Sequence, residues 1–208
     1  MASIDHVLLA TTELDHGERQ LWHAYGLRCL PGGSHLSWGT ANRVVPIGRQ
    51  YLELVAVENR ELAAGSLLGR AVLAAAERDR LCPIGLCLAV EHLEAVAARL
   101  GTAVEEGTRT LADGTEIGWQ SVGLEQAFGQ VRLPFFIRWR DPGQHPSRGR
   151  AEHRVAAQEI SLVEVGGPEA TLRRHLGGEV PGVLAVGGAP GIHSLAISDL
   201  GGGQTQLP

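Results

Sequence analysis

Apolar and polar positions in the first quarter of the chain predict one strand, one helix and three further strands. An apolar run at residues 4–10 predicts the first strand. Apolar side chains at helical spacing in residues 13–25 predict a helix, and Gly26 ends it. Three strands are expected after it, at residues 29–36, 42–47 and 51–57. The predicted order is β-α-β-β-β.

The same order recurs in the middle of the chain. Residues 84–90 predict a strand, and residues 91–100 predict a helix that ends at Gly101. Three more strands are expected, at residues 102–108, 116–122 and 133–139. Between the two units, residues 58–62 are expected to be a linker and residues 66–80 a helix that Pro83 ends.

A third restart follows the polar segment 141–150. It consists of a strand at residues 157–165, a helix at 168–176, and two strands at 183–186 and 192–198. The glycines at 201–203 are expected to form a flexible terminus. The third unit is therefore predicted to be truncated.

These three starts, about 76 to 80 residues apart, predict the fold class. We expect an α+β chain in which tandem βαβββ modules, at about residues 1–58 and 83–140, form a curved mixed sheet with helices outside. Residues 1–150 would make one domain, and residues 151–208 a truncated βαββ extension packing on it.

Composition excludes several classes of partner. With 44% hydrophobic and 20% charged residues, the 208-residue chain is globular, and its net charge of −5 favours neither nucleic acid nor anionic lipid. No apolar run approaches the ~20 residues that span a bilayer, and the first residues do not resemble a signal peptide. A cytoplasmic protein with a small-molecule partner is expected. Its three cysteines lack metal-site spacing and are predicted to be buried thiols.

A carboxylate in an apolar strand marks the candidate site. Alternation in residues 51–56 places Tyr51, Glu53 and Val55 on one face and the leucines on the other. A buried carboxylate is costly unless it is paired, hydrogen-bonded or bound to metal. The face that carries Glu53 is therefore expected to line a site, while the leucine face packs on a helix.

Four short motifs occur in a fixed order and carry a resemblance. They are Ile4-Asp5-His6-Val7, Gly32-Gly33-Ser34-His35, Gly39-Thr40-Ala41-Asn42 and Tyr51-Leu52-Glu53-Leu54. Together with the repeated βαβββ order, they resemble the vicinal oxygen chelate superfamily of glyoxalases, extradiol dioxygenases and fosfomycin- and bleomycin-resistance proteins, and within it the glyoxalase-like domain. The resemblance implies a cup that binds a divalent metal such as Zn, Ni, Fe or Mn, with His6 and Glu53 as first-module ligands. It also suggests a homodimer.

The second module departs from this pattern. Aligning the first strands of the two modules puts Leu86 where the resemblance expects a ligand. A third ligand would then come from elsewhere, with His35, His145 and His193 as candidates in that order. A set of His6, His35 and Glu53 would match a two-histidine, one-carboxylate site.

Further residues are expected around this site. Glu53 would also be the catalytic group, and the predicted substrate-binding residues are Trp38, Asn42, Tyr51 and His145. If Trp139 faces outward, Arg138 and Arg140 face inward and favour an anionic substrate.

Several functions remain open from the sequence. One is a metal-dependent lyase, isomerase or dioxygenase acting on a small oxygenated molecule, and another is a protein of the same fold that only sequesters its ligand. A His6–Glu53 pair that acts as a base without metal is a further alternative, as is an interaction scaffold with no site.

Overall fold

The computed structural model describes residues 1–78, 80–199 and 201–207. In the first module, β1 (Ser3–Ala10) is followed by α1 (Leu14–Gln20), which continues as a π-helical turn at Leu21–Tyr25. Gly26 ends this helix in the left-handed region at φ 68°. Three strands complete the module: β2 (Leu30–His35), β3 (Thr40–Ile47) and β4 (Gln50–Val57). The predicted order and most of its boundaries are confirmed.

The second module repeats this order. It contains β5 (Cys82–Ala89), α4 (Leu93–Leu100), β6 (Glu105–Leu111), β7 (Glu116–Val122) and β8 (Phe135–Trp139). A short helix that the sequence did not suggest, α5 (Leu124–Phe128), interrupts it.

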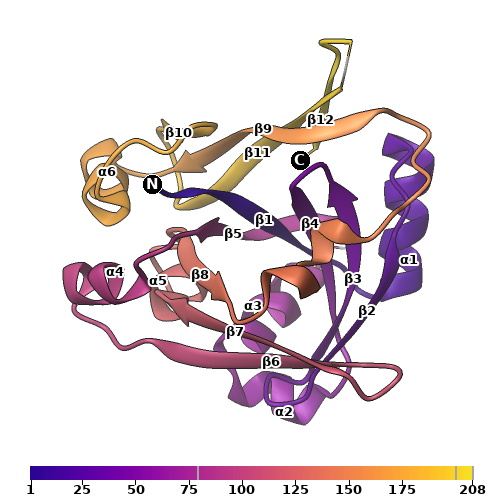
Figure 1. Ribbon diagram of the computed structural model, residues 1–208, viewed down its shortest axis with the longest axis horizontal. Helices are drawn as coiled ribbons and strands as arrows, with labels where there is room; N and C mark the ends of the chain where they lie inside the picture. Colours follow the sequence, from indigo (N-terminus) through magenta and orange to yellow (C-terminus); the bar gives the residue numbers. More distant parts are fainter. Residues whose placement is uncertain (79, 200, 208) are drawn as a thin grey trace.

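The two modules close into one barrel with strand order β1-β4-β3-β2-β6-β7-β8-β5 (Figure 1). In each module the first strand pairs parallel with the last, β1 with β4 and β5 with β8. The modules meet at two antiparallel seams, the long β1–β5 pair and the short β2–β6 pair. The predicted curved mixed sheet is confirmed.

The connection between the modules differs from the prediction. Residues 58–62, expected to be a linker, enter the helix α2 (Arg60–Gly65), which Asn59 caps by accepting a hydrogen bond from the Leu62 amide. The next helix, α3 (Leu67–Ala76), is shorter than the predicted span 66–80. Asp79, within that predicted span, lies outside the described residues. Pro83 does not end that helix but lies in β5, because the chain leaves the helix several residues earlier.

The C-terminal unit has one strand more than predicted. It comprises β9 (Ala157–Gly166), α6 (Glu169–Leu176), β10 (Val183–Val186), β11 (Gly191–Asp199) and β12 (Gln204–Leu207). The expected flexible terminus at residues 201–203 stays a prediction. Residues 204–207, for which no strand was predicted, pair with β11; Leu200 and Pro208 lie outside the described residues. The sheet order, β10-β9-β11-β12, differs from that of the barrel modules.

Two apolar clusters lie on the two faces of the barrel wall. On the outer face, side chains such as Leu9 and Leu54 pack with α1, α4 and the C-terminal sheet, which Figure 1 shows above the barrel. On the inner face, Leu8 and Val55 pack with Leu68 of α3 and with residues of α5. The three cysteines are buried free thiols, as predicted. Among the described residues, no helix has the length and apolarity needed to cross a membrane.

Candidate functional site

A bulge in β1 brings Asp5 and His6 together. On the partner strand β5, Ile4 lies opposite Leu88 and His6 opposite Cys87, so Asp5 is the extra residue of the pair. The His6 Nδ1 atom lies 2.7 Å from Asp5 Oδ1, and both side chains are buried. The bulge therefore fixes the His6 ring with its Nε2 atom on the side away from Asp5.

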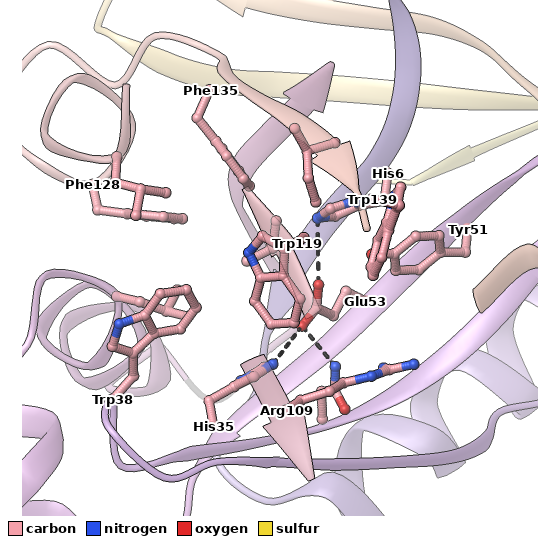
Figure 2. Close-up of a pocket in the computed structure, with 15 residues that line it drawn as sticks. His6, His35, Trp38, Tyr51, Glu53, Arg109, Trp119, Phe128, Phe135 and Trp139 are labelled. Carbon is pink, nitrogen blue, oxygen red and sulfur yellow. Dashed lines mark hydrogen bonds and ion pairs between the residues drawn. The ribbon is translucent and has the colours of Figure 1, made fainter. Parts of the chain in front are cut away.

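The Glu53 carboxylate lies between two histidines (Figure 2). Its Oε2 atom is 3.4 Å from His6 Nε2, and its Oε1 atom is 3.6 Å from His35 Nε2. Both distances exceed the usual N–H···O hydrogen-bond range of about 2.7–3.2 Å. All three side chains are buried, so groups from β1, β2 and β4 meet at one carboxylate.

Asn42 holds the Glu53 carboxylate from the neighbouring strand β3. Its Nδ2 atom donates to Glu53 Oε1 at 2.7 Å, and its Oδ1 atom accepts from the Gly33 amide at 2.8 Å. A Cβ atom on Gly32 would overlap both the side chain and the backbone of Asn42. Gly32 is therefore needed for the close approach of Asn42, whereas a Cβ atom on Gly33 would meet the Thr110 backbone of β6.

His35 is fixed at its other ring nitrogen. Its Nδ1 atom lies 3.1 Å from the Thr40 hydroxyl. Burial lowers the pKa of His35 and outweighs the nearby Glu53, which acts in the opposite direction; Arg109 lowers the pKa further. The neutral imidazole is therefore favoured, with Nε2 facing Glu53.

Asp5 is the centre of a hydrogen-bond network beside the site. Trp139 Nε1 donates to its Oδ2 atom at 3.1 Å, and His145 Nε2 lies 3.2 Å from the same oxygen. Burial acts to raise the pKa of Asp5, but the hydrogen bonds from His145 and His6 outweigh it and hold the pKa well below its usual range. Asp5 is thus a carboxylate that orients His6.

Glu53, His6, His35 and Asn42 line one small pocket. Its cavity of about 30 Å³ has room for one or two water molecules or an ion. The wall is largely aromatic, with side chains from both modules: Trp38, Tyr51, Trp119, Phe128, Phe135 and Trp139. The Tyr51 ring stacks on His6 at 4.4 Å between centroids, and burial, with nearby Glu53 and Asp5, raises the pKa of Tyr51 well above its usual value.

Strand pairing corrects the predicted counterpart of His6 in the second module. His6 pairs with Tyr51 in the parallel β1–β4 pair, and Cys87 pairs with Phe135 in the parallel β5–β8 pair. Cys87 therefore takes the place of His6, whereas Leu86, which the sequence alignment put there, packs in the outer cluster. A one-residue offset moves a strand side chain to the opposite face, and the bulge in β1 hides this offset from the sequence.

A comparison with known protein families identifies the family of this chain. The profile of the family described as Glyoxalase-like domain matches residues 4–178. This chain belongs to the glyoxalase-like domain family. The comparison with curated proteins gave no match.

A solved structure shares the fold of this glyoxalase-like domain. A hypothetical protein from Staphylococcus aureus is 17% identical, with all of this chain and 99% of that chain covered, at a TM-score of 0.75. A variant of methylmalonyl-CoA epimerase from Streptomyces coelicolor, in complex with 2-nitronate-propionyl-CoA, is also 17% identical; 66% of this chain and 97% of that chain are covered, at a TM-score of 0.47.

The predicted site residues of this glyoxalase-like domain divide into two groups. His6, His35, Trp38, Asn42, Tyr51 and Glu53 all line the pocket. His145 instead contacts Asp5 beside the pocket, with its Nε2 atom 3.2 Å from Asp5 Oδ2. His193 lies in the C-terminal sheet, with its Nε2 atom 2.8 Å from the Ala189 carbonyl oxygen. For both groups, the assignment as metal ligands or substrate-binding residues stays a prediction.

Two sets of side chains are candidates for a metal site. Among the described residues, Asp5, His6 and Cys87 place donor atoms within 4.8 Å of one another. However, Asp5 already accepts three hydrogen bonds, and burial raises the pKa of Cys87 well above its usual value, which favours the neutral thiol. The Nε2 atoms of His6 and His35 lie 3.4 and 3.6 Å from the two different oxygens of Glu53, and these three residues do not form a group whose donor atoms all lie within 4.8 Å of one another. Because zinc ligands at about 2.0–2.2 Å stand roughly 3.3–3.5 Å apart, this second set would have to move closer together to hold one metal ion.

The sequence interpretation missed Arg109 of β6. This arginine lines the pocket and is 6% exposed. By contrast, Arg138 and Arg140, the arginines considered from the sequence, pair with Glu94 and Glu106 at the surface. Alternation along β6 was the available signal, since Arg109 shares a strand face with Gly107, against which Trp119 packs.

Proposed function

We propose that this glyoxalase-like domain is a divalent-metal-dependent enzyme that acts on a small oxygenated molecule by lyase, isomerase or dioxygenase chemistry. One observation carries the proposal. The buried Glu53 carboxylate faces the Nε2 atoms of His6 and His35 at 3.4 and 3.6 Å, while the other nitrogen of each ring is held by Asp5 or Thr40. Metal-binding histidines commonly have their second nitrogen fixed in this way.

His6, His35 and Glu53 would hold the metal. Two imidazole nitrogens and one carboxylate suit Zn, Ni, Fe or Mn and leave positions for substrate oxygens. The hydrogen bond from Asn42 to Glu53 Oε1 would orient the carboxylate. When bound, the metal would polarise a substrate oxygen and stabilise developing negative charge.

The protein groups would supply the remaining chemistry. Glu53 is the carboxylate inside the pocket, and we assign it the transfer of a proton to or from the substrate. Tyr51, Trp119 and Phe135 form an apolar wall that excludes water and strengthens these electrostatic effects. Since the cavity has about 30 Å³, an organic substrate requires the lining side chains to move apart.

The aromatic wall also favours a second candidate function. A protein that sequesters an apolar or aromatic ligand needs such walls but no metal and no turnover. Trp38, Trp119 and Trp139 all line the pocket, which suits this role. Metal content separates the two functions, because only the first requires it.

Metal analysis of the purified protein tests the proposal. We expect about one metal ion per chain after incubation with Zn, Ni, Fe or Mn and removal of excess, measured by mass spectrometry of the elements. His6→Ala and Glu53→Gln should each lower metal affinity by at least about tenfold, because each removes a ligand. Cys87→Ser should retain the metal, which distinguishes the two donor sets.

His193→Ala provides the matched control, since this histidine is exposed in the C-terminal sheet. It should bind metal as the wild type does. A wild-type protein that takes up none of the four metals contradicts the proposal and favours the sequestering function. Metal that persists in both His6→Ala and Glu53→Gln contradicts the ligand assignment.

A further inference from the structure

Arg109 brings a positive charge into the pocket from the second module. It lies in β6 opposite Ile117 of β7, and Figure 2 shows it below Glu53, beside His35. Its side chain lines the pocket although the residue is only 6% exposed. The electrostatic effect of Arg109 on both His35 and Tyr51 agrees with this position.

The guanidinium group lacks a partner at its Nε atom. That atom is buried and has no hydrogen-bond partner among the described residues. The carboxylate in the pocket, Glu53, is instead held by Asn42 and faces the two histidines. Because a buried charge without full hydrogen bonding is costly, the arrangement suits a site that an anion completes.

Two other arginines in the barrel are partly exposed and paired with carboxylates. Arg43 pairs with Asp15 and Glu18, and Arg140 pairs with Glu106, all at least partly exposed. Arg109 is more buried than either, yet the part of the chain that the structure describes offers its Nε atom no hydrogen-bond partner. Packing of β6 does not require a guanidinium there, since an apolar side chain would fill the same aromatic surroundings without a desolvated charge.

We propose that Arg109 binds the carboxylate of the substrate, and that the substrate class is small carboxylic acids with a further oxygen on the neighbouring carbon. The role of that second oxygen rests on the proposed function. Binding of the carboxylate by Arg109 does not. A planar guanidinium matches the two oxygens of a carboxylate. A guanidinium also binds phosphate in this way, so inorganic phosphate is the competing anion that the experiment includes.

Binding of matched charged and neutral probes tests the proposal. Pyruvate and its neutral amide, pyruvamide, differ mainly in charge, and the tryptophans of the pocket report binding by their fluorescence. In EDTA, wild-type protein should bind pyruvate about tenfold to a hundredfold more tightly than pyruvamide, the range expected for hydrogen bonds to a charged group. Arg109→Met should lose this preference, and Arg109→Lys should keep part of it.

Arg140→Met is the matched control, because it removes an exposed arginine from the edge of the same barrel. It should keep the wild-type preference for pyruvate. The result that overturns the proposal is an equal preference in wild type and Arg109→Met, or no preference in the wild type. Tighter binding of inorganic phosphate than of pyruvate would overturn the choice of carboxylate.

Thermal unfolding without ligand separates binding from a structural role. Arg109→Met should unfold at the wild-type temperature or above, because it removes an incompletely paired buried charge. Lower unfolding temperatures in both the Met and Lys variants, with an unchanged probe preference, would show a structural arginine and overturn the proposal. Since EDTA excludes metal from these measurements, a failure of the metal experiment leaves their outcome unaffected.

Discussion

Asn42 connects a glycine-rich strand to the carboxylate at the centre of the site. It accepts a hydrogen bond from the Gly33 amide and donates one to Glu53, so its position decides which way the Glu53 carboxylate faces. Gly32 provides the necessary space, since a Cβ atom there would meet the Asn42 backbone as well as its side chain. Rotation of the Asn42 side chain alone cannot relieve this overlap.

Gly32→Ala should therefore destabilise the protein and disturb the site. We expect a loss of about 1–3 kcal/mol in the free energy of unfolding, as for overpacking in a core, measured by urea denaturation. Gly65→Ala is the control, because nothing lies within 4 Å of its added Cβ atom and Gly65 is in α2. A Gly32→Ala protein as stable as the Gly65→Ala protein would contradict the steric interpretation.

At the same scale, some site residues could be predicted from sequence and others could not. Alternation in β4 places Glu53 on the same strand face as Tyr51 and Val55. The resemblance to the superfamily identifies His6 as a candidate metal ligand. Asp5 and Cys87 could not be placed, because the bulge in β1 and the one-residue offset in β5 decide which face each side chain occupies. Likewise, the sequence does not reveal that Arg109 Nε has no hydrogen-bond partner among residues 1–78, 80–199 and 201–207, because this depends on neighbours from other strands.

Strand β12 shows how an element escapes a hydrophobic pattern. Its sequence, Gln-Thr-Gln-Leu, contains one apolar residue, so neither alternation nor composition predicts a strand. Asp199 shapes the preceding turn by accepting hydrogen bonds from the amides of Gly201 and Gly203. Pairing with β11 then brings Leu207 into the outer cluster, where it is 1% exposed. Tertiary pairing, not local preference, makes this strand.

Leu207→Ala tests whether β12 contributes to stability. We expect a loss of about 2 kcal/mol, near the lower end for buried leucines because the strand lies at the edge of its sheet, together with faster amide exchange in β11. Gln206→Ala, which changes an exposed side chain of the same strand, should leave both unchanged. Equal stability of the two variants would show that the Leu207 contact contributes little.

The whole molecule combines a barrel with a second sheet that packs on its outer face. The outer cluster contains Leu9 and Leu88 of the barrel as well as Ile160 and Leu195 of the C-terminal sheet. The curved mixed sheet of two βαβββ modules followed from the repeat in the sequence, whereas its closure into a barrel is seen only in the structure. The different strand order of the third unit could not, because the order of elements does not specify which strands pair. The predicted domain boundary at residue 150 remains a prediction.

His175 of α6 makes a polar contact between these two parts. Its Nε2 atom lies 2.6 Å from the Pro134 carbonyl oxygen, which only accepts, so Nε2–H is the donor. Burial lowers the pKa of His175 from its usual 6.5, and Arg99 lowers it further, although the bond to Pro134 opposes them. The folded protein therefore keeps His175 neutral at a pH where the unfolded chain would take up a proton.

Stability should consequently fall as the pH drops below 6.5. Between the lowered pKa and 6.5, the unfolded state binds more protons than the folded state, so the free energy of unfolding changes by up to about 1.4 kcal/mol per pH unit for each such histidine. Urea denaturation from pH 8 to pH 5 should show a shallower decline for His175→Gln than for wild type. Some decline should remain, because burial lowers the pKa of His35 as well. His193→Gln, which changes an exposed histidine, should follow the wild-type curve. If His175→Gln also follows it, the contact with Pro134 does not couple protonation to the packing of the two sheets.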